Sequence, residues 1–313
     1  MIRSTRPFVR GWQTQGRAIG HHYGCLAHST NTEVKVVKDG DAVGTSGPID
    51  TPIPTTTHFG FKTVASEEKE TLVGSVFSSV ASSYDVMNDA MSFGIHRLWK
   101  DRFVKRLLAV EGTSHQQPIQ VLDVAGGTGD IAKRILEASR NSGGQCHVQV
   151  LDINADMLAQ GQKRFEGLGQ GYSDQSTFTV GNAEELKDVP DNSIDLYTIA
   201  FGIRNCTHID RVLEQAHRVL KKGGVFSCLE FSKVTSTPLS SLYRAYSFSV
   251  IPNLGHIIAG DRDSYQYLVE SIERFPNQED FARMIKQAGF VMADPGWENL
   301  TLGVAAIHTG VKM

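Results

Sequence analysis

A glycine-rich turn between two carboxylates is the segment of this sequence best suited to bind a small ligand. Residues 121–130 read VLDVAGGTGD, so a short apolar run leads into the turn and a helical pattern follows it. Gly126, Gly127 and Gly129 let the backbone approach a ligand where a Cβ atom would collide. The first N–H groups of the following helix have no partner inside that helix and can face the ligand. We therefore predict a ligand site at this strand-to-helix turn.

Two classes of ligand fit the turn. Gly127, Gly129 and Ala132 satisfy the GxGxxA pattern of dinucleotide sites, which is typical of nicotinamide-dependent oxidoreductases. Asp123 and Asp130, however, flank the turn with negative charge that would repel a diphosphate. The Asp123 carboxylate could instead help to hold the amino group of the methionine moiety of S-adenosylmethionine, directly or through water. We favour S-adenosylmethionine as the cofactor and keep the oxidoreductase as the alternative.

Other polar residues that follow apolar runs could contact the same ligand. Asp152 lies 152 − 129 = 23 residues beyond Gly129, where a carboxylate can accept hydrogen bonds from both ribose hydroxyls. A helix N-cap is the alternative role for Asp152. Asn182 could bind an adenine edge and Ala183 would leave room for the ring, although asparagine is also a common turn residue. Arg204 would lie at the same edge of the sheet, near a methyl donor, unless it is a surface arginine paired with an acid.

The order of apolar runs and helical repeats indicates how these residues are positioned. The runs alternate with the repeats, which implies right-handed crossovers and a parallel sheet covered on both faces. The predicted strands are 119–124, 147–153, 177–180, 194–201, 225–231, 290–293 and 300–308, and the predicted helices are 131–139, 155–165, 209–220 and 281–288. A helical pattern over 67–110, broken at Ser92–Gly94, precedes them. We predict an α/β fold with a doubly wound, mostly parallel seven-stranded sheet, an N-terminal helical extension, and ligands beyond the carboxyl ends of the strands.

Charge and cysteine content exclude several classes of function. The net charge of −3 over 313 residues gives no broad basic surface, so we do not expect nucleic acid as a partner. The sequence has no run of 18 apolar residues, so we expect no transmembrane helix. The four cysteines lie far apart without a CxxC pair, which argues against a zinc site and a disulfide framework. No other metal-ligand spacing is present, and we predict no metal.

The N-terminus differs in kind from the rest. Residues 1–32 contain four arginines and no acid, and Glu33 is the first acidic residue. This composition predicts a mitochondrial transit peptide, with an untargeted basic tail as the alternative. Residues 33–56 are rich in Gly, Pro, Thr and Asp and are predicted to form a disordered linker. The enzyme domain would then span 57–313.

Several longer motifs resemble one enzyme family. They are YDVMND at 84–89, GIHRLWK at 94–100, the glycine turn, FGIRN at 201–205, and DSYQYL at 263–268, which runs on to FP at 275–276. In this order they are similar to the ubiquinone/menaquinone biosynthesis C-methyltransferases, from Thr57 to the C-terminus. The resemblance implies that 57–313 is a methyltransferase domain with the class I S-adenosylmethionine-dependent, Rossmann-like fold.

The resemblance also implies roles for individual residues. The family's cofactor contacts correspond here to Thr128, Asp152, Asn182 and Ala183. Arg204, Asp152 and Tyr84 would help to deprotonate the substrate. Because a guanidinium stays protonated, we expect Arg204 to stabilise a phenolate or orient a water molecule rather than to act as a base. Bacterial members carry a serine where this chain has Ala200, so a contact from that hydroxyl is absent here.

The implied reaction is C-methylation of 2-methoxy-6-polyprenyl-1,4-benzoquinol to its 5-methyl derivative in ubiquinone biosynthesis. The predicted transit peptide favours this over a menaquinone role. The resemblance implies peripheral attachment to the matrix side of the mitochondrial inner membrane and a multisubunit ubiquinone-biosynthesis complex, and it allows a homodimer. A non-catalytic scaffold subunit of that complex is a second alternative.

An interrupted apolar stretch at 240–260 could cover the site. Its apolar residues would line a channel for the tail or pack as an ordinary core helix; they are Val250, Ile251, Leu254, Ile257 and Ile258.

Overall fold

The computed structural model describes residues 55–80, 84–111 and 118–313. The predicted transit peptide and residues 33–54 of the predicted linker lie outside these residues. The described part opens with an antiparallel hairpin of β1 (Thr56–Phe59) and β2 (Lys62–Ala65), which the sequence analysis did not anticipate. Three helices follow, α1 (Ser66–Val80), α2 (Tyr84–Ser92) and α3 (Ile95–Glu111), and the predicted break after Ser92 is confirmed.

The central sheet follows the predicted alternation of strands and helices. Its strands are β3 (Ile119–Val124), β4 (Cys146–Asp152), β5 (Ser176–Val180), β6 (Ile194–Ala200), β7 (Leu220–Phe231), β8 (Phe290–Val291), β9 (Trp297–Leu300) and β10 (Ala305–Lys312). They run in the order β5-β4-β3-β6-β7-β10-β8, in which β3 to β7 are parallel and β10 is antiparallel to β7. This order confirms the doubly wound α/β fold of class I S-adenosylmethionine-dependent methyltransferases.

The last edge of the sheet differs in detail from the prediction. Both β8 and β9 pair with β10, which pairs with β7 on its other side. The seventh position of the sheet is therefore shared by two short strands. The predicted strand 300–308 is wrong in its start, because β9 ends at Leu300 and a short 3₁₀ turn, Thr301–Gly303, intervenes before β10. Thr301 and Leu302 have φ values of 46° and 58°, which a strand cannot accommodate.

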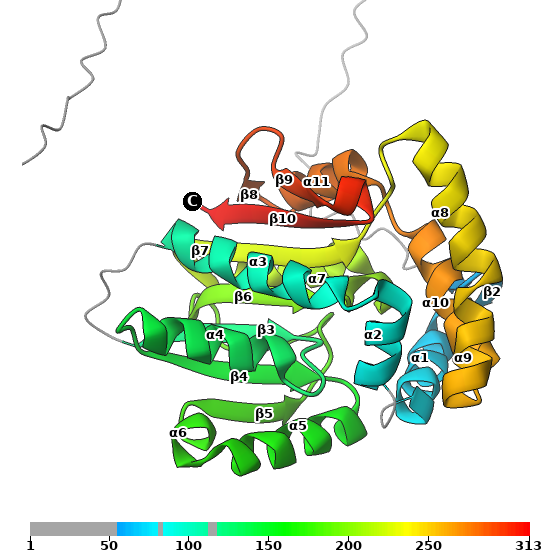
Figure 1. Cartoon of the computed structure of the whole chain (residues 1–313). Helices are drawn as coiled ribbons and strands as arrows, with labels where there is room; N and C mark the ends of the chain where they lie inside the picture. Colours follow the sequence, from blue (N-terminus) through cyan, green and yellow to red (C-terminus); the bar gives the residue numbers. More distant parts are fainter. Residues whose placement is uncertain (1–54, 81–83, 112–117) are drawn as a thin grey trace, which may run out of the picture. The chain divides into compact units, whose positions relative to one another are not determined.

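Helices cover both faces of the sheet (Figure 1). They are α3, α4 (Asp130–Asn141), α5 (Ala155–Leu168), α6 (Gln170–Ser173), α7 (Ile209–Val219) and α11 (Gln278–Gln287). Successive strand residues enter opposite layers of core: Val121 packs with α3, α4 and α5, and Leu122 packs with α7 and α11. A sheet buried on both faces leaves its strand ends, rather than its faces, for ligands.

A group of helices gathers at one end of the sheet (Figure 1). It contains α1, α2, α8 (Thr237–Ser249), α9 (Ile251–Ala259) and α10 (Arg262–Arg274). A separate apolar cluster of Met87, Ile251, Tyr265 and Val269 holds α2, α9 and α10 together. The predicted cover at 240–260 is thus two helices, and α9 starts next to Pro252. In the described part of the chain, no helix combines the length and apolar character needed to cross a membrane.

Candidate active site

The predicted glycine turn joins β3 to α4, and its geometry requires glycine at two positions. Gly129 has a φ of 75°, and a Cβ atom there would lie 2.8 Å from the ring of Phe165. A Cβ atom on Gly126 would lie 2.7 Å from a methyl group of Val150 and 2.9 Å from the Asp123 carboxylate. Both distances are shorter than van der Waals contact allows, so the close approach of the backbone depends on the missing side chains.

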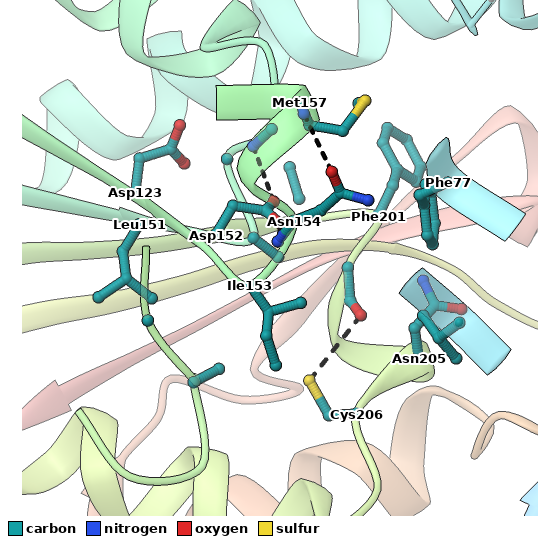
Figure 2. A pocket seen from close by; sticks show the side chains of 18 of the residues that line it. Phe77, Asp123, Leu151, Asp152, Ile153, Asn154, Met157, Phe201, Asn205 and Cys206 are labelled. Atoms are coloured by element: carbon teal, nitrogen blue, oxygen red, sulfur yellow. Dashed lines mark hydrogen bonds between the residues drawn. The ribbon is translucent and has the colours of Figure 1, made fainter. Parts of the chain in front are cut away.

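Asp152 closes the turn from the neighbouring strand. Its Oδ2 accepts a hydrogen bond from the Gly127 backbone N–H at 2.9 Å, and its Oδ1 accepts one from the Asn154 N–H at 2.9 Å. Burial raises the pKa of Asp152, and these backbone donors counteract part of that rise. The N-cap alternative is wrong, because the side chain of Asn154 caps α5 by accepting from the backbone N–H groups of Asp156 and Met157. Figure 2 shows the bond from Met157.

Asp123 lies at the base of the same pocket and carries an unused acceptor. It is fully buried, and its Oδ1 accepts a hydrogen bond from the Thr198 hydroxyl at 2.8 Å. Its Oδ2 is buried without a hydrogen-bond partner. Burial raises the pKa of this carboxyl to about 7. An orphaned acidic oxygen beside the glycine turn fits a cationic donor, such as the amino group of S-adenosylmethionine.

The charge argument against a diphosphate is weaker than the sequence suggested. Nζ of Lys100 lies 2.8 Å from Asp130, and Nε of Arg134 lies 3.3 Å from the same carboxylate. Burial alone would raise the pKa of Asp130, but Lys100 and the neighbouring arginines lower it to about 2. Asp130 is therefore charged but compensated, so it adds little to the repulsion of an anion. The expectation that Asp130 helps to exclude a dinucleotide is corrected on this ground.

The remaining predicted contacts line the same pocket from β5 and the glycine turn. Asn182 and Ala183 follow β5, and Thr128 lies in the turn. Oδ1 of Asn182 accepts a hydrogen bond from the Glu184 N–H at 2.8 Å, so the turn role considered for this residue is present as well. Its Nδ2 donates to Glu70 at 3.3 Å and retains a second hydrogen for a ligand.

One wall of the pocket was not predicted from the sequence. It is contributed by α1 through Glu70, Val73, Gly74 and Phe77. Figure 2 labels Phe77 and Phe201, which both line this cavity. Helical periodicity alone does not show that this face of α1 covers a ligand site rather than core, so no sequence signal identified it. We call this cavity the donor pocket.

A second pocket adjoins the first, and we call it the acceptor pocket. Its described lining is Val76, Phe77, Asn88, Met91, His96, Lys100, Phe201, Arg204, Phe231, Ser264, Tyr265, Tyr267 and Leu268. Phe77, Lys100 and Phe201 belong to both linings. Because these three residues line both pockets, a ligand in one would lie close to a ligand in the other. The polyprenyl-channel candidates on α9 line neither pocket: Ile251 is core, and Ile257 is 76% exposed.

Arg204 lies between the acceptor pocket and a buried acid. Its Nη1 is 2.8 Å from Oε1 of Glu230 on β7 and also donates to the Phe201 carbonyl. Both ionic side chains are buried, so the alternative of a surface arginine is wrong, although its pairing with an acid is correct. Nε of Arg204 is buried without a partner. Burial raises the pKa of Glu230, and the guanidinium counteracts that effect.

Two of the three predicted catalytic residues line different but adjoining pockets. Arg204 lines the acceptor pocket, whereas Asp152 lines the donor pocket. Tyr84 is the first residue of α2, and the described structure gives its backbone only. His96 and Lys100 belong to a motif quoted for the family resemblance, but the sequence analysis assigned them no role. Glu230 lies in an ordinary strand, so nothing in its sequence context marked it.

Comparison with known proteins decides the family. A model of the ubiE/COQ5 methyltransferase family matches residues 62–312. The chain belongs to the ubiE/COQ5 methyltransferase family. It is 60% identical over 260 residues to the mitochondrial 2-methoxy-6-polyprenyl-1,4-benzoquinol methylase of Schizosaccharomyces pombe, covering 82% of this chain and 84% of that protein. It is 50% identical over 283 residues to the ubiquinone/menaquinone biosynthesis C-methyltransferase UbiE of Brucella abortus, covering 90% and 98%.

Family membership settles the class of enzyme. This ubiE/COQ5 family member is an S-adenosylmethionine-dependent methyltransferase, and the nicotinamide-dependent oxidoreductase alternative is set aside. The crystal structure of the [4+2]-cyclase SpnF superimposes with a TM-score of 0.52 at 17% identity, covering 78% of this chain and 96% of that one. That likeness concerns the fold alone.

Proposed function

We propose that this enzyme methylates C5 of 2-methoxy-6-polyprenyl-1,4-benzoquinol in ubiquinone biosynthesis, using S-adenosylmethionine. The observation that carries the proposal is the wall that the donor and acceptor pockets share at Phe77, Lys100 and Phe201. Proteins named for this reaction are 50–60% identical over most of this chain. Two cationic side chains, Arg204 and Lys100, line the acceptor pocket, and the partner of Lys100 is Asp130 of the donor pocket.

Residues that line the donor pocket can be assigned to the parts of S-adenosylmethionine. We assign the amino group to Asp123, whose Oδ2 has no other partner, and the ribose hydroxyls to Asp152. Asn182 and Ala183 would hold the adenine, and Thr128 would contact the methionine moiety. Gly126, Gly127 and Gly129 supply the close backbone approach. When bound, S-adenosylmethionine supplies an electrophilic methyl group on a sulfonium.

Residues of the acceptor pocket prepare the ring. An aromatic carbon is a poor nucleophile, and removal of a phenolic proton moves electron density onto the ortho carbon. Arg204 stabilises the resulting phenolate with a fixed positive charge in a site shielded from water. Glu230 holds the guanidinium of Arg204 in place. The Nε of Arg204 has no partner in the structure and is available to donate to the phenolate oxygen. We assign Asp152 to the cofactor rather than to the proton, and keep Tyr84 as a candidate contact to the ring.

The apolar tail of the substrate and the surface of the helices suggest attachment to a membrane. Three apolar side chains on α2, on α3 and between them are strongly exposed: Val86, Phe93 and Leu98. Helix α2 also packs against α9, whose Ile257 is 76% exposed. We propose that these four side chains contact the matrix side of the mitochondrial inner membrane peripherally. Relatives named as mitochondrial support the compartment. Membership of a ubiquinone-biosynthesis complex and a homodimer remain part of the proposal.

Transfer of a labelled methyl group tests the function directly. The purified chain would be given S-adenosylmethionine with a labelled methyl group and the reduced demethylated quinol, and the product would be analysed by mass spectrometry. We expect one labelled methyl group on C5, the ring carbon between the C4 hydroxyl and the tail at C6. Label on an oxygen, or no transfer with S-adenosylhomocysteine bound normally, would reject C-methylation and favour a scaffold role.

A further inference from the structure

His96 is a titratable side chain of the acceptor pocket to which neither sequence nor family assigned a role. It lies in the first turn of α3, is 7% exposed, and lines the pocket together with Arg204 and Phe231. A buried imidazole beside a substrate pocket is a candidate for proton transfer. The question is which ring nitrogen carries the proton.

The hydroxyl of Ser92 determines the tautomer. Ser92 Oγ lies 2.6 Å from the carbonyl oxygen of Asn88 and 2.8 Å from Nδ1 of His96. A carbonyl oxygen cannot donate, so the first contact takes the single hydrogen of the hydroxyl. The second contact is then a hydrogen bond donated by Nδ1–H to Ser92 Oγ. The lone pair of the neutral ring is therefore on Nε2.

Among the residues whose side chains the structure describes, none makes a hydrogen bond to Nε2 of His96. The nearest carboxylate oxygen, Oδ1 of Asp89, is 3.8 Å away, which is too long for a hydrogen bond. Both oxygens of Asp89 are already bound by Arg97, at 2.7 and 2.6 Å. Burial lowers the pKa of His96, Lys100 and Arg97 lower it further, and Asp89 and Asp130 raise it. The balance keeps the ring neutral at pH 7.

The other described polar groups of the pocket are poor bases. Arg204 is a guanidinium in an ion pair with Glu230, and Lys100 is paired with Asp130. The hydroxyl of Tyr267 donates to Asn205 at 3.0 Å, and burial raises its pKa. The two cations have no acceptor, and the oxygen of a tyrosine hydroxyl can accept a hydrogen bond but is only weakly basic, so none of these three side chains readily takes a phenolic proton.

We propose that Nε2 of His96 is the general base that removes the phenolic proton of the acceptor ring. This assignment rests on the proposed function and names its proton acceptor. The O–H bond breaks, the proton moves to Nε2, and the electron pair delocalises to the ortho carbon. The carbon–methyl bond forms as the sulfur–methyl bond breaks. The ring proton on that carbon then leaves to water, and His96 returns its proton to the oxygen, so the overall reaction releases one proton.

The decisive variants are His96→Gln and His96→Ala, with His256→Asn as the matched control on an exposed face of α9. We expect turnover of His96→Gln to fall by about 10²–10⁴-fold, the usual contribution of a general base. Affinity for S-adenosylhomocysteine should stay within about twofold, because His96 does not line the donor pocket. In the unsubstituted enzyme, kcat should rise through an acid limb below pH 6.5 that is missing in His96→Gln. Added imidazole should restore part of the rate of His96→Ala, and His256→Asn should behave as the unsubstituted enzyme.

A measurement that does not depend on activity distinguishes a general base from a histidine that only supports the structure. Nitrogen-15 NMR of the histidine rings, assigned by comparison with His96→Gln, should show His96 as the neutral Nδ1–H tautomer at pH 7. An Nε2–H tautomer, an acid limb that persists in His96→Gln, or a loss of turnover without imidazole rescue would each overturn the assignment. If the unsubstituted enzyme transfers no methyl group to quinol, the proposed function itself fails, and the inference fails with it.

Discussion

The backbone N–H of Gly127 donates to Oδ2 of Asp152 across 2.9 Å, joining the glycine turn after β3 to the end of β4. This bond fixes the two parts of the donor pocket that sequence motifs identify separately. Because the N–H lies in a turn at a φ of 52°, its direction depends on a backbone conformation that few residues other than glycine adopt. The carboxylate therefore shapes the pocket as well as offering acceptors to a ribose.

The first prediction concerns Asp152→Asn. The amide replaces one acceptor oxygen with a donor, so it repels either Gly127 N–H or Asn154 N–H and removes the charged acceptor for the ribose. Hydrogen bonds to charged groups are worth about 1.5–3 kcal/mol each, so we expect S-adenosylhomocysteine to bind about 10–100-fold more weakly. Isothermal titration calorimetry measures this. Glu166→Gln, on an exposed part of α5, serves as the control, and an affinity unchanged in Asp152→Asn would remove the ribose assignment.

The second prediction concerns a proton released on cofactor binding. The pKa of Asp123 is raised to about 7, so about half of the apo enzyme holds a proton there at pH 7. A cationic amino group at Oδ2 favours the ionised form, and binding should therefore release about half a proton at pH 7. Calorimetry of S-adenosylhomocysteine binding in buffers of different ionisation enthalpy gives the number. Asp123→Asn should release none, and equal release in both proteins would contradict the assignment.

The same carboxyl should give a distinct dependence of stability on pH. Its pKa is about 3.8 unfolded and about 7 folded, so between these values the folded chain holds a proton that the unfolded chain has lost. The stability contributed by Asp123 is complete below pH 4 and is lost as the pH rises through 7. Urea unfolding at several pH values should show this loss in the unsubstituted enzyme and a flatter profile in Asp123→Asn.

Much of the donor pocket could be predicted from the sequence because local patterns determine it. A strand, a glycine turn and a helix are encoded within ten residues, and the ends of parallel strands meet at one edge of a sheet. Asp123, Asp152 and Asn182 follow from those two facts. The sequence does not show that the charge of Asp130 is compensated, because its partner Lys100 comes from a helix 30 residues earlier.

The acceptor pocket was less predictable for the same physical reason. Its polar residues come from α2, α3, the turn after β6 and α10, and it is their packing that brings them together. Glu230 is an acidic residue in the apolar part of β7, and only the three-dimensional structure shows that Arg204 is its partner. The exposure of Phe93 likewise depends on how α2 and α3 meet, at a residue with a φ of 51°.

The third prediction separates steric overlap from backbone strain in the glycine turn. Gly129 and Gly143 both have a φ of 75°, but a Cβ atom on Gly143 would meet nothing within 4 Å. Alanine at either position pays the left-handed backbone cost of about 1–2 kcal/mol. Gly129→Ala should lose about 1–3 kcal/mol more, because its methyl group overlaps Phe165. Urea unfolding measures the unfolding free energy of the two variants. Equal losses of this free energy would show that the turn can relax around the methyl group.

The fourth prediction concerns the exposed apolar side chains. Burial of a side chain such as Phe in an apolar phase contributes about 1.5–3 kcal/mol, so Phe93→Asp should weaken binding to vesicles containing anionic lipid by at least about tenfold. Flotation of the full chain with such vesicles measures binding. Val291→Asp on β8 is the control, because Val291 is 55% exposed but lies at the far edge of the sheet. Similar flotation of both variants would argue that Phe93 faces a protein partner instead.

The last prediction concerns the buried ion pair of Arg204 and Glu230. Removal of one partner leaves the other charge buried and unpaired, so Arg204→Met and Glu230→Met should each cost about 3–5 kcal/mol of unfolding free energy. The double variant removes both charges, and its stability should lie closer to that of the unsubstituted enzyme than either single variant does. Turnover should be lost in all three, because the guanidinium is absent or displaced.

Urea unfolding of the four proteins gives the coupling between the two side chains. The exposed pair of Arg283 and Asp280, whose side chains are 58% and 47% exposed, is the matched control and should show almost no coupling. If the double variant loses as much unfolding free energy as the two single variants together, Arg204 is not held by Glu230 in solution. Arg204 would then be free to leave the acceptor pocket, and a fixed cation could no longer account for stabilisation of the phenolate. Coupling of several kcal/mol would instead show that the buried carboxylate of Glu230 holds this cation beside the ring.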